Sequence, residues 1–449
     1  MSLPINQHRV VIVSMPLVDE DTPLAAPAVL KAALMAQGIQ CVGLDLNIEI
    51  YNKIKHHPQR HLFLDFFYKQ HIHESIVDDL VRMLDFYATE ILWHKPTIVG
   101  LSIFFAGTKT FTAWLSAVIR TRAPDVKIVI GGPGMQTLEN SLFKFPDRLR
   151  QLGLIDDYIV GDGEVALVEY VKGNLSYPGI NSINWQQIKE FDQMPIPDFS
   201  DYKFLNYRYV LLPIVDSRGC VQDCEFCDVI AFWTKFQYRT ADNIFNQMMH
   251  YIEKHKVYRF QFASSICNGN FREFKKLLKL IAHHNRTRYD AEKIHWVGSF
   301  IIRPAKQHTK ELWALIKETN GFLFCGVESL VEHVRIGLGK RFTNDDLEHH
   351  LVMGQQYQVP MNLLLISSYP TETFEDYEYS KQWFRDHAQY ANNPVQQVQL
   401  TLPAVFPGTR LEKNVDIQEF KRNDLMRSFH FQEMQEVIKQ SGFNVQCFN

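Results

Sequence analysis

Three cysteines within one short segment constrain this chain more than any other feature of its sequence. Cys220, Cys224 and Cys227 follow the spacing C-x3-C-x2-C, without a fourth cysteine nearby. A structural zinc ion takes four protein ligands, usually as two separated pairs. Three thiolates on an iron–sulfur cluster instead leave one iron open to a small molecule. The spacing therefore favours a reactive cluster over the two alternatives, a zinc site or plain buried thiols.

Composition places the chain among globular enzymes with more than one domain. It has 449 residues, of which 46% are hydrophobic and 22% charged, enough for two cores. The net charge of −3 predicts neither nucleic acid nor an anionic membrane as a partner. No apolar stretch is long enough to span a bilayer, and the other four cysteines show no disulfide framework. We expect a cytoplasmic protein that has no membrane association.

The first part of the chain alternates β-branched runs with helical segments, the pattern of a parallel sheet covered on both faces. It predicts an α/β domain of the Rossmann or flavodoxin type over residues 1–195, with a helical insert at 48–96. Ligands of such sheets bind at the carboxyl ends of the strands. The expected strands are 10–13, 41–44, 98–102, 127–131 and 158–160.

The second part repeats a strand followed by a helix, which predicts a partial (β/α)6 barrel over residues 196–410 and a helical segment at 411–449. Barrels carry their chemistry at the carboxyl ends of the strands. The expected strands are 211–215, 259–263, 295–300, 322–327, 361–366 and 398–402. The polar residues at their ends are Cys220, Ser264, Arg303, Glu328 and Ser368.

The cysteine triplet, with Phe226 before its last member, resembles the signature of radical S-adenosylmethionine (SAM) enzymes. The resemblance implies a [4Fe–4S] cluster on Cys220, Cys224 and Cys227, whose open iron binds SAM and whose electron cleaves it to a 5′-deoxyadenosyl radical. The segment 326–329, Gly-Val-Glu-Ser, resembles the family's fourth-strand motif. The SAM-binding residues implied in this way are Phe226, Ser264, Gly326, Glu328, Ser329 and Arg303.

Alternatives and departures accompany these assignments. Glu328 could be structural, and Arg303 could form a salt bridge at the barrel rim instead of binding a carboxylate. Residues 264–265 are serines where relatives often carry aspartates, and residues 368–373 depart from the family's glycine-rich turn after the fifth strand. The contacts to SAM or substrate at these two strand ends could therefore differ from those of relatives.

Three strand ends of the first part, residues 100–102, 131–133 and 161–164, resemble those of the cobalamin-binding domain that precedes many radical SAM domains. No G-x-G-x-x-G follows the first strand, which disfavours a dinucleotide site. The loop 15–22 lacks the histidine that ligates cobalt in other cobalamin domains. Tight turns in a sheet without its ligand are the alternative. The resemblance assigns cobalamin binding to Ser102, Gly131, Gly132, Gly134, Gly161, Gly163 and Glu164.

The resemblance implies a cobalamin-dependent radical SAM enzyme that methylates an unactivated carbon of a small molecule and takes electrons from a donor such as flavodoxin or ferredoxin. Cyclisation, ring rearrangement or oxidation with the same cofactors stays open, and so does a non-catalytic cobalamin or cluster sensor. Methylthiotransferases share the cysteine triplet but need a second cluster in their first domain. Cys41 is the only cysteine before Cys220, which disfavours that activity.

Overall fold

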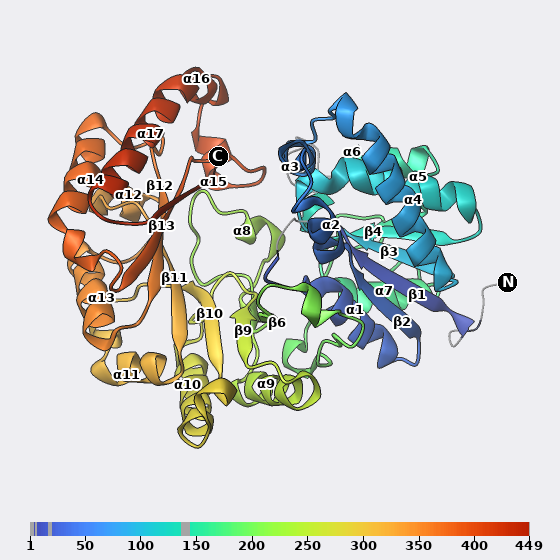
Figure 1. Cartoon of the computed structure of the whole chain (residues 1–449), viewed down its shortest axis with the longest axis horizontal. Coiled ribbons are helices and arrows are strands. Elements are labelled where there is room, and N and C mark those ends of the chain that lie inside the picture. The colour runs from blue at the N-terminus through green and yellow to red at the C-terminus, as the bar shows by residue number, and fades with distance from the viewer. Residues whose placement is uncertain (1–3, 5–6, 17–19, 136–143, 449) are drawn as a thin grey trace. The chain divides into compact units, whose positions relative to one another are not determined.

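The computed structural model describes all residues except 1–3, 5–6, 17–19, 136–143 and 449. The chain divides into two compact units, Met1–Pro213 and Ile214–Asn449, which we describe separately (Figure 1). The domain boundaries expected at residues 195 and 410 stay predictions. Part of the loop 15–22, residues 17–19, lies outside the described residues.

The first unit contains a parallel five-stranded sheet in the order β2-β1-β3-β4-β5. This is the strand order of flavodoxin-like folds, in which the ligand site lies where the order reverses, between β1 and β3. The predicted fold class and all five predicted strands are confirmed. The strands are β1 (Arg9–Ser14), β2 (Gln40–Asp45), β3 (Ile98–Ser102), β4 (Lys127–Gly131) and β5 (Asp157–Ile159).

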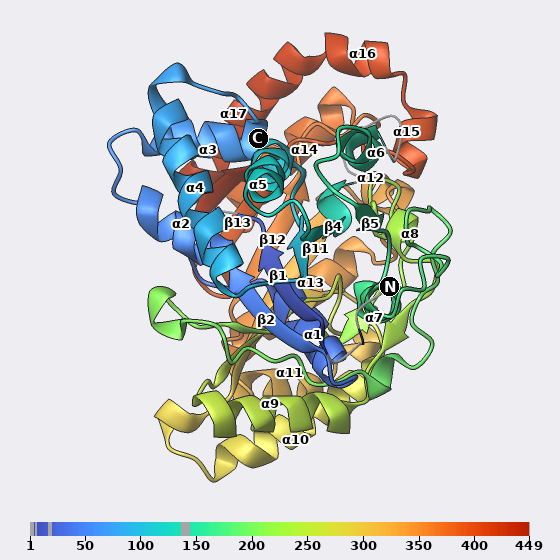
Figure 2. The ribbon, with the colours of Figure 1, turned by 90° about the vertical axis from the view of Figure 1, so that its right-hand side faces the viewer.

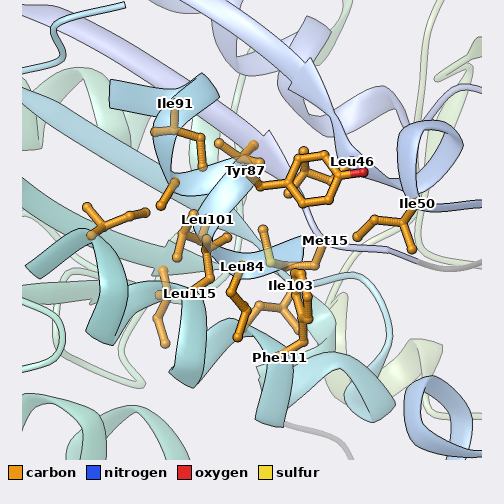
Figure 3. Close-up of a cluster of buried hydrophobic side chains, with 14 of the residues drawn as sticks. Met15, Leu46, Ile50, Leu84, Tyr87, Ile91, Leu101, Ile103, Phe111 and Leu115 are labelled. Atoms are coloured by element: carbon orange, nitrogen blue, oxygen red, sulfur yellow. The ribbon is translucent and has the colours of Figure 1, made fainter. Parts of the chain in front are cut away.

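Helices cover both faces of this sheet because successive residues of its buried strands point to opposite sides. Val10 and Ile12 join one apolar cluster with α1 (Ala25–Met35) and α7 (Gly163–Val171). Val11 and Val13 join the other, part of which Figure 3 shows. The helices on that second side are α2 (Leu46–Ile54), α3 (Arg60–Lys69), α4 (Val77–Trp93), α5 (Lys109–Arg122) and α6 (Lys144–Gln151), so the helical insert forms much of this core.

The segment that follows α7 is fixed to the first unit by buried polar contacts. Lys31, which is buried, donates hydrogen bonds to Ser200 and Asp201 at 2.8 and 2.6 Å. The hydroxyl of Tyr207 donates to the carboxylate of Asp45 at 2.6 Å. Burial raises the pKa of Asp45, and the donors around its carboxylate partly offset this effect.

The second unit contains a sheet of seven strands in the order β14-β13-β12-β11-β10-β9-β6. The first six strands in sequence match the six predicted ones, so the partial barrel is confirmed. The seventh, β14 (Val445–Phe448), pairs parallel to β13 and comes from the segment expected to be helical. The others are β6 (Leu212–Ile214), β9 (Arg259–Phe262), β10 (His295–Phe300), β11 (Gly321–Glu328), β12 (Met361–Ile366) and β13 (Val395–Thr401).

Helices of the second unit lie along the outer side of its sheet, and Figure 2 shows two of them, α9 and α10, side by side. Several begin at a residue whose side chain accepts a backbone hydrogen bond, among them Thr240, Asn270 and Thr343. In the described part of the chain, no helix has the length and apolar character needed to cross a membrane. The long helices are α9 (Ala241–His255), α10 (Phe271–Arg286), α11 (Lys310–Glu318), α13 (Asn344–Tyr357), α14 (Phe374–Asp386) and α17 (Asp424–Gln440), and the short ones are α8 (Val229–Phe232), α12 (Glu332–Gly337), α15 (Arg410–Asn414) and α16 (Ile417–Arg422).

The Tyr207 contact predicts a local stability effect. Tyr207→Phe removes one donor from the buried Asp45 carboxylate, so we expect the free energy of unfolding to fall by about 1–3 kcal/mol. Urea denaturation at neutral pH measures it. The matched variant Tyr209→Phe, whose ring is 54% exposed, should change that free energy by less than about 0.5 kcal/mol. Equal effects of the two variants would show that the Tyr207 hydroxyl contributes nothing.

Candidate functional site

The three cysteines lie in a loop of residues 219–228, called here the cysteine loop, which follows the short strand β7 (Ser217–Arg218). Gly219 at its start has φ +76°, and a Cβ atom there would lie 2.9 Å from the carbonyl oxygen of Lys235, so the turn requires glycine. Cys224 is buried, while Cys220 and Cys227 are half-buried. All three are free thiols.

Three other elements hold the cysteine loop through Glu225. The backbone N–H of Glu225 donates to the carbonyl oxygen of Leu338 at the end of α12 (2.9 Å). Its carbonyl oxygen accepts from the N–H of Leu411 in α15 (3.0 Å). Its carboxylate accepts from the Tyr369 hydroxyl, after β12, at 2.9 Å. The fold of the second unit thus fixes where the thiols lie.

The surroundings of Cys224 and Cys227 disfavour ionisation of these two thiols in the protein alone. Burial raises the pKa of Cys227 to about 12, and the neighbouring Cys224 and Cys220 contribute to this rise. Burial also raises the pKa of Cys224. In the described part of the chain, no three Cys, His, Asp or Glu side chains are placed to bind one metal ion together. Cysteines that each bind a different iron of a cluster need not lie that close.

A buried ion pair lies beside the cysteine loop. The Lys340 Nζ and Glu328 Oε1 atoms are 3.0 Å apart, and each side chain is only 12% exposed. Burial lowers the pKa of Lys340, but Glu328 and the Cys224 and Cys220 thiols outweigh this effect, so the pKa is raised overall. A Cβ atom at Gly326 would lie 2.6 Å from the Glu328 oxygen and 2.8 Å from the Lys340 nitrogen. Glycine at this position makes room for the pair.

Lys340 is a site residue that was not predicted from the sequence. Its signal is a lysine in a glycine-bounded turn, residues 337–340, that follows the fourth-strand motif. The turn approaches the cysteine loop closely, because a Cβ atom at Gly339 would lie 3.1 Å from the Cα atom of Cys224. The structure therefore brings together Cys224, Gly326, Glu328 and the unpredicted Lys340.

Other residues predicted to bind SAM have partners within the protein. The Ser329 hydroxyl oxygen accepts from the N–H of Val331 at 3.2 Å, at the start of α12. The Arg303 Nη2 group donates to the carbonyl oxygens of Asn268 and Gly269 at 2.7 and 3.0 Å, so it holds the loop after β9. Both contacts give these residues a structural role beside the SAM-binding role that stays a prediction.

Phe226 and Ser264 differ in their surroundings. Phe226 is half-buried and packs against an apolar cluster that contains Val331, Leu338 and Tyr369. The Ser264 hydroxyl is buried beside the carboxylate of Asp216. Burial raises the pKa of Asp216 to about 7, and the hydrogen bond from Ser264 acts in the opposite direction. Both assignments to SAM stay predictions.

In the first unit, the predicted cobalamin residues of β3 and β4 lie side by side. Ser102 and Gly131 are partners in register. Gly132 has φ +101°, and a Cβ atom there would lie 2.4 Å from the Ile103 carbonyl oxygen. A Cβ atom at Gly134 would lie 2.8 Å from the Ile103 side chain and the Phe105 backbone. Gly132 and Gly134 are therefore needed for the close packing of two loops, whatever ligand contacts their backbone makes.

The end of β5 is packed in a similar way. Gly161 has φ +83°, and a Cβ atom there would lie 2.2 Å from the Trp185 ring. Gly163 begins α7, and Glu164 is buried in the first turn of that helix. The structure thus explains Gly161 by the indole that covers it, while binding of cobalamin by Gly161, Gly163 and Glu164 stays a prediction.

One exposed aromatic residue at this edge was not predicted. Phe104 lies two residues after Ser102 and is 57% exposed, although it stands beyond the carboxyl end of a buried strand. An exposed apolar side chain beside the reversal point of the strand order is a candidate ligand contact. A phenylalanine two residues beyond a strand carries no functional signal in the sequence alone.

These two units, in this order, have the fold of the cobalamin-dependent radical SAM enzymes. The structure is similar to that of the radical SAM methyltransferase TsrM from Kitasatospora setae, solved with cobalamin and a [4Fe–4S] cluster. The TM-score is 0.67 with 16% identity, over 93% of this chain and 78% of TsrM. It is also similar to the cobalamin-dependent SAM radical enzyme OxsB with aqua-cobalamin, with a TM-score of 0.62 and 14% identity, over 98% of this chain and 58% of OxsB.

Two curated proteins are similar in sequence, and no protein-family model matches the chain. One, from Methanocaldococcus jannaschii, bears the name "Putative methylthiotransferase"; it is 22% identical over 340 residues, 70% of this chain and 69% of the relative. The other is the cytidylyl-2-hydroxyethylphosphonate methyltransferase of Streptomyces wedmorensis. It is 19% identical over 251 residues, 45% of this chain and 44% of the relative.

The buried ion pair predicts a large stability effect. Lys340→Met leaves the Glu328 carboxylate buried without its cation, so we expect the free energy of unfolding to fall by about 3–5 kcal/mol. Urea denaturation measures it. Lys439→Met removes an exposed pair with Glu436 and should cost less than about 1 kcal/mol.

The double variant Lys340→Met/Glu328→Leu separates charge from packing. It removes both charges, so we expect it to recover much of the loss, because no unpaired charge stays buried. A double variant as unstable as Lys340→Met would contradict this account of the pair.

Proposed function

We propose that the chain is a cobalamin-dependent radical SAM enzyme that methylates an unactivated carbon of a small molecule. The observation that carries this proposal is the cysteine loop, whose three thiols lie at the carboxyl ends of barrel strands next to the buried Lys340–Glu328 pair. The fold shared with TsrM and OxsB supports it, because cobalamin is bound in the structures of both.

The residues around the cysteine loop fit a cluster and SAM. Cys220, Cys224 and Cys227 would ligate three irons as thiolates, and the cation of Lys340 offsets part of their charge. Glu328 presents a carboxylate at the same place, suited to the hydroxyl and amino groups of SAM. The cluster supplies the electron for the cleavage of SAM, and cobalamin supplies the methyl group.

The carboxyl edge of the first unit fits cobalamin. Ser102 ends β3, one of the two strands between which the strand order reverses, and Gly131 is its partner in register on β4. The exposed Phe104 lies two residues after Ser102. The loop 15–22 offers no histidine, so cobalt would lack that ligand from this chain. A small molecule is the proposed substrate, and an electron donor such as flavodoxin or ferredoxin is the proposed partner. Nucleic acid is not, given the net charge of −3.

The number of cysteines in the first unit favours transfer of a methyl group over transfer of a methylthio group. The M. jannaschii relative is named for methylthio transfer. In this chain Cys41 is the only cysteine before Cys220. Burial raises the pKa of the Cys41 thiol to about 12. One half-buried thiol cannot hold a second cluster in the first unit.

Removal of one cluster ligand tests the proposed chemistry. After anaerobic reconstitution, we expect Cys224→Ala to lose most of its iron and acid-labile sulfide. Its formation of 5′-deoxyadenosine from SAM under reducing conditions should fall by about 100-fold or more, because the electron reaches SAM only through the cluster. Cys447→Ala, in β14, serves as the control and should retain both properties. Full iron content and SAM cleavage in Cys224→Ala would disprove the proposal.

A second variant tests the cobalamin edge. We expect Phe104→Ala to retain about tenfold less cobalamin after incubation with hydroxocobalamin and desalting, because an apolar contact at the site is lost. Trp93→Ala is the control. Trp93 is 76% exposed at the end of α4 that leads into β3, and therefore lies at the opposite edge of the sheet. Equal retention by both variants would place cobalamin away from the end of β3.

A further inference from the structure

The two faces of the barrel sheet are distinguished by their contacts. On β10, Trp296 and Phe300 pack against Phe274 of α10. On β11, the Cys325 thiol lies 3.3 Å from the Nε2 atom of His350 in α13. These side chains face the helices, and because side chains alternate along a strand, the residues between them face the inside of the barrel.

Between the Arg259–His295 pair at the amino ends of β9 and β10 and Glu328 at the carboxyl end of β11, strand register arranges the inner residues in three rows. The members of each row are partners on neighbouring parallel strands, so their side chains lie side by side. The rows carry amides and aromatic rings, and none of their residues is charged. From the amino ends to the carboxyl ends of the strands, the three rows are Gln261–Val297–Phe322, Ser299–Phe324–Asn362–Gln397, and Gly326–Leu364–Gln399.

The amides of β12 and β13 form one group beside an aromatic wall on β11. The Gln399 Nε2 group donates to the Oε1 atom of Gln397 at 3.4 Å. The rings of Phe322 and Phe324 have centroids 5.5 Å apart. Gln397, Gln399 and both rings are half-buried, whereas the helix-facing residues are fully buried, so the inner face is partly accessible.

Asn362, in the middle row, is the buried amide of this face. Its side chain is 6% exposed, and its Oδ1 atom has no hydrogen-bond partner among the described residues. A buried carbonyl oxygen without a partner costs free energy, and a ligand that donates an N–H or O–H group there would remove that cost. An amide oxygen accepts such a donor without requiring a charge on the ligand.

We propose that the inner face of the barrel binds the substrate, and that this substrate is an uncharged, planar molecule with an amide or heteroaromatic N–H edge. Its flat face lies against Phe322 and Phe324, and its N–H group donates to the Oδ1 atom of Asn362. A carboxylate or ammonium group is disfavoured, because the three rows offer it no opposite charge. This inference rests on the proposed function, whose substrate class it names.

The test uses matched probes in which a neutral carboxamide with N–H donors is replaced by a carboxylate, which has a negative charge and no donor. The pairs are nicotinamide and nicotinate, benzamide and benzoate, and indole-3-acetamide and indole-3-acetate. Binding to the full-length wild-type protein is measured by ligand-observed NMR titration at neutral pH. We expect at least one amide to bind about tenfold more tightly than its carboxylate. Failure of every amide to bind, or equal binding of amide and carboxylate, would overturn the inference.

Variants locate the binding. Asn362→Leu should weaken binding of the amide probe about tenfold, because it removes the acceptor while it keeps the volume. Gln399→Leu should weaken it as well, and it serves if Asn362→Leu does not fold. Gln382→Leu changes an exposed amide of α14 and should bind like the wild type. Unchanged binding by folded Asn362→Leu or Gln399→Leu would refute the proposed site.

Iron content and SAM cleavage of the wild-type protein separate this inference from the proposed function. A chain that holds a cluster and cleaves SAM, but shows no preference for the amides, would overturn the substrate class alone. A chain that binds the amides through Asn362 but holds no cluster would overturn the proposed function and support the inner face as a ligand site.

Discussion

Lys340 and Glu328 form one ion pair in the barrel whose two side chains are each only 12% exposed, so each charge depends on the other for its compensation. Gly326 leaves room for the pair, and the turn at Gly339 packs on the backbone of Cys224. The fourth strand, the turn after α12 and the cysteine loop are therefore one packed unit, centred on a single ion pair. The Lys340 cation also acts against the burial that raises the pKa of Cys224, and the thiolate is the form of cysteine that binds iron. The same contact thus serves both the fold and the chemistry that we propose.

In the first unit, polar contacts restrict where a ligand can reach the sheet. The carboxyl end of β2 is closed, because the Asp45 carboxylate accepts hydrogen bonds from Ser14 and Tyr207. The end of β5 is covered by Trp185. The ends of β3 and β4 remain, where Ser102 and the exposed Phe104 lie. The closed positions and the strand order thus agree on the end of β3.

The strands could be predicted because most are short runs of β-branched, aromatic or other apolar residues, with helical segments between them. β14, with four residues after a long helix, is too short for that. The roles of single residues were harder to predict, because they depend on contacts between distant segments. The sequence predicts a ligand contact at Gly161, but in the structure the ring of Trp185 packs against this glycine. The role of Lys340 depends on its contacts with Glu328 and Cys224, and no local sequence pattern predicts these contacts.

The distribution of groups on β11 suits a reaction that passes through a carbon radical. Glu328 ends the strand at the charged mouth, whereas Phe322 and Phe324 face the inside and carry no S–H hydrogen for a radical to abstract. The thiol of Cys325 could quench a radical by giving up its hydrogen, but it points to the helix side and lies against His350. Because alternate residues of a strand face opposite sides, one strand can supply an inert wall inside the barrel and keep its reactive thiol outside. The exclusion of competing hydrogen donors is thus built into the register of the strand, and it requires no movement of the protein.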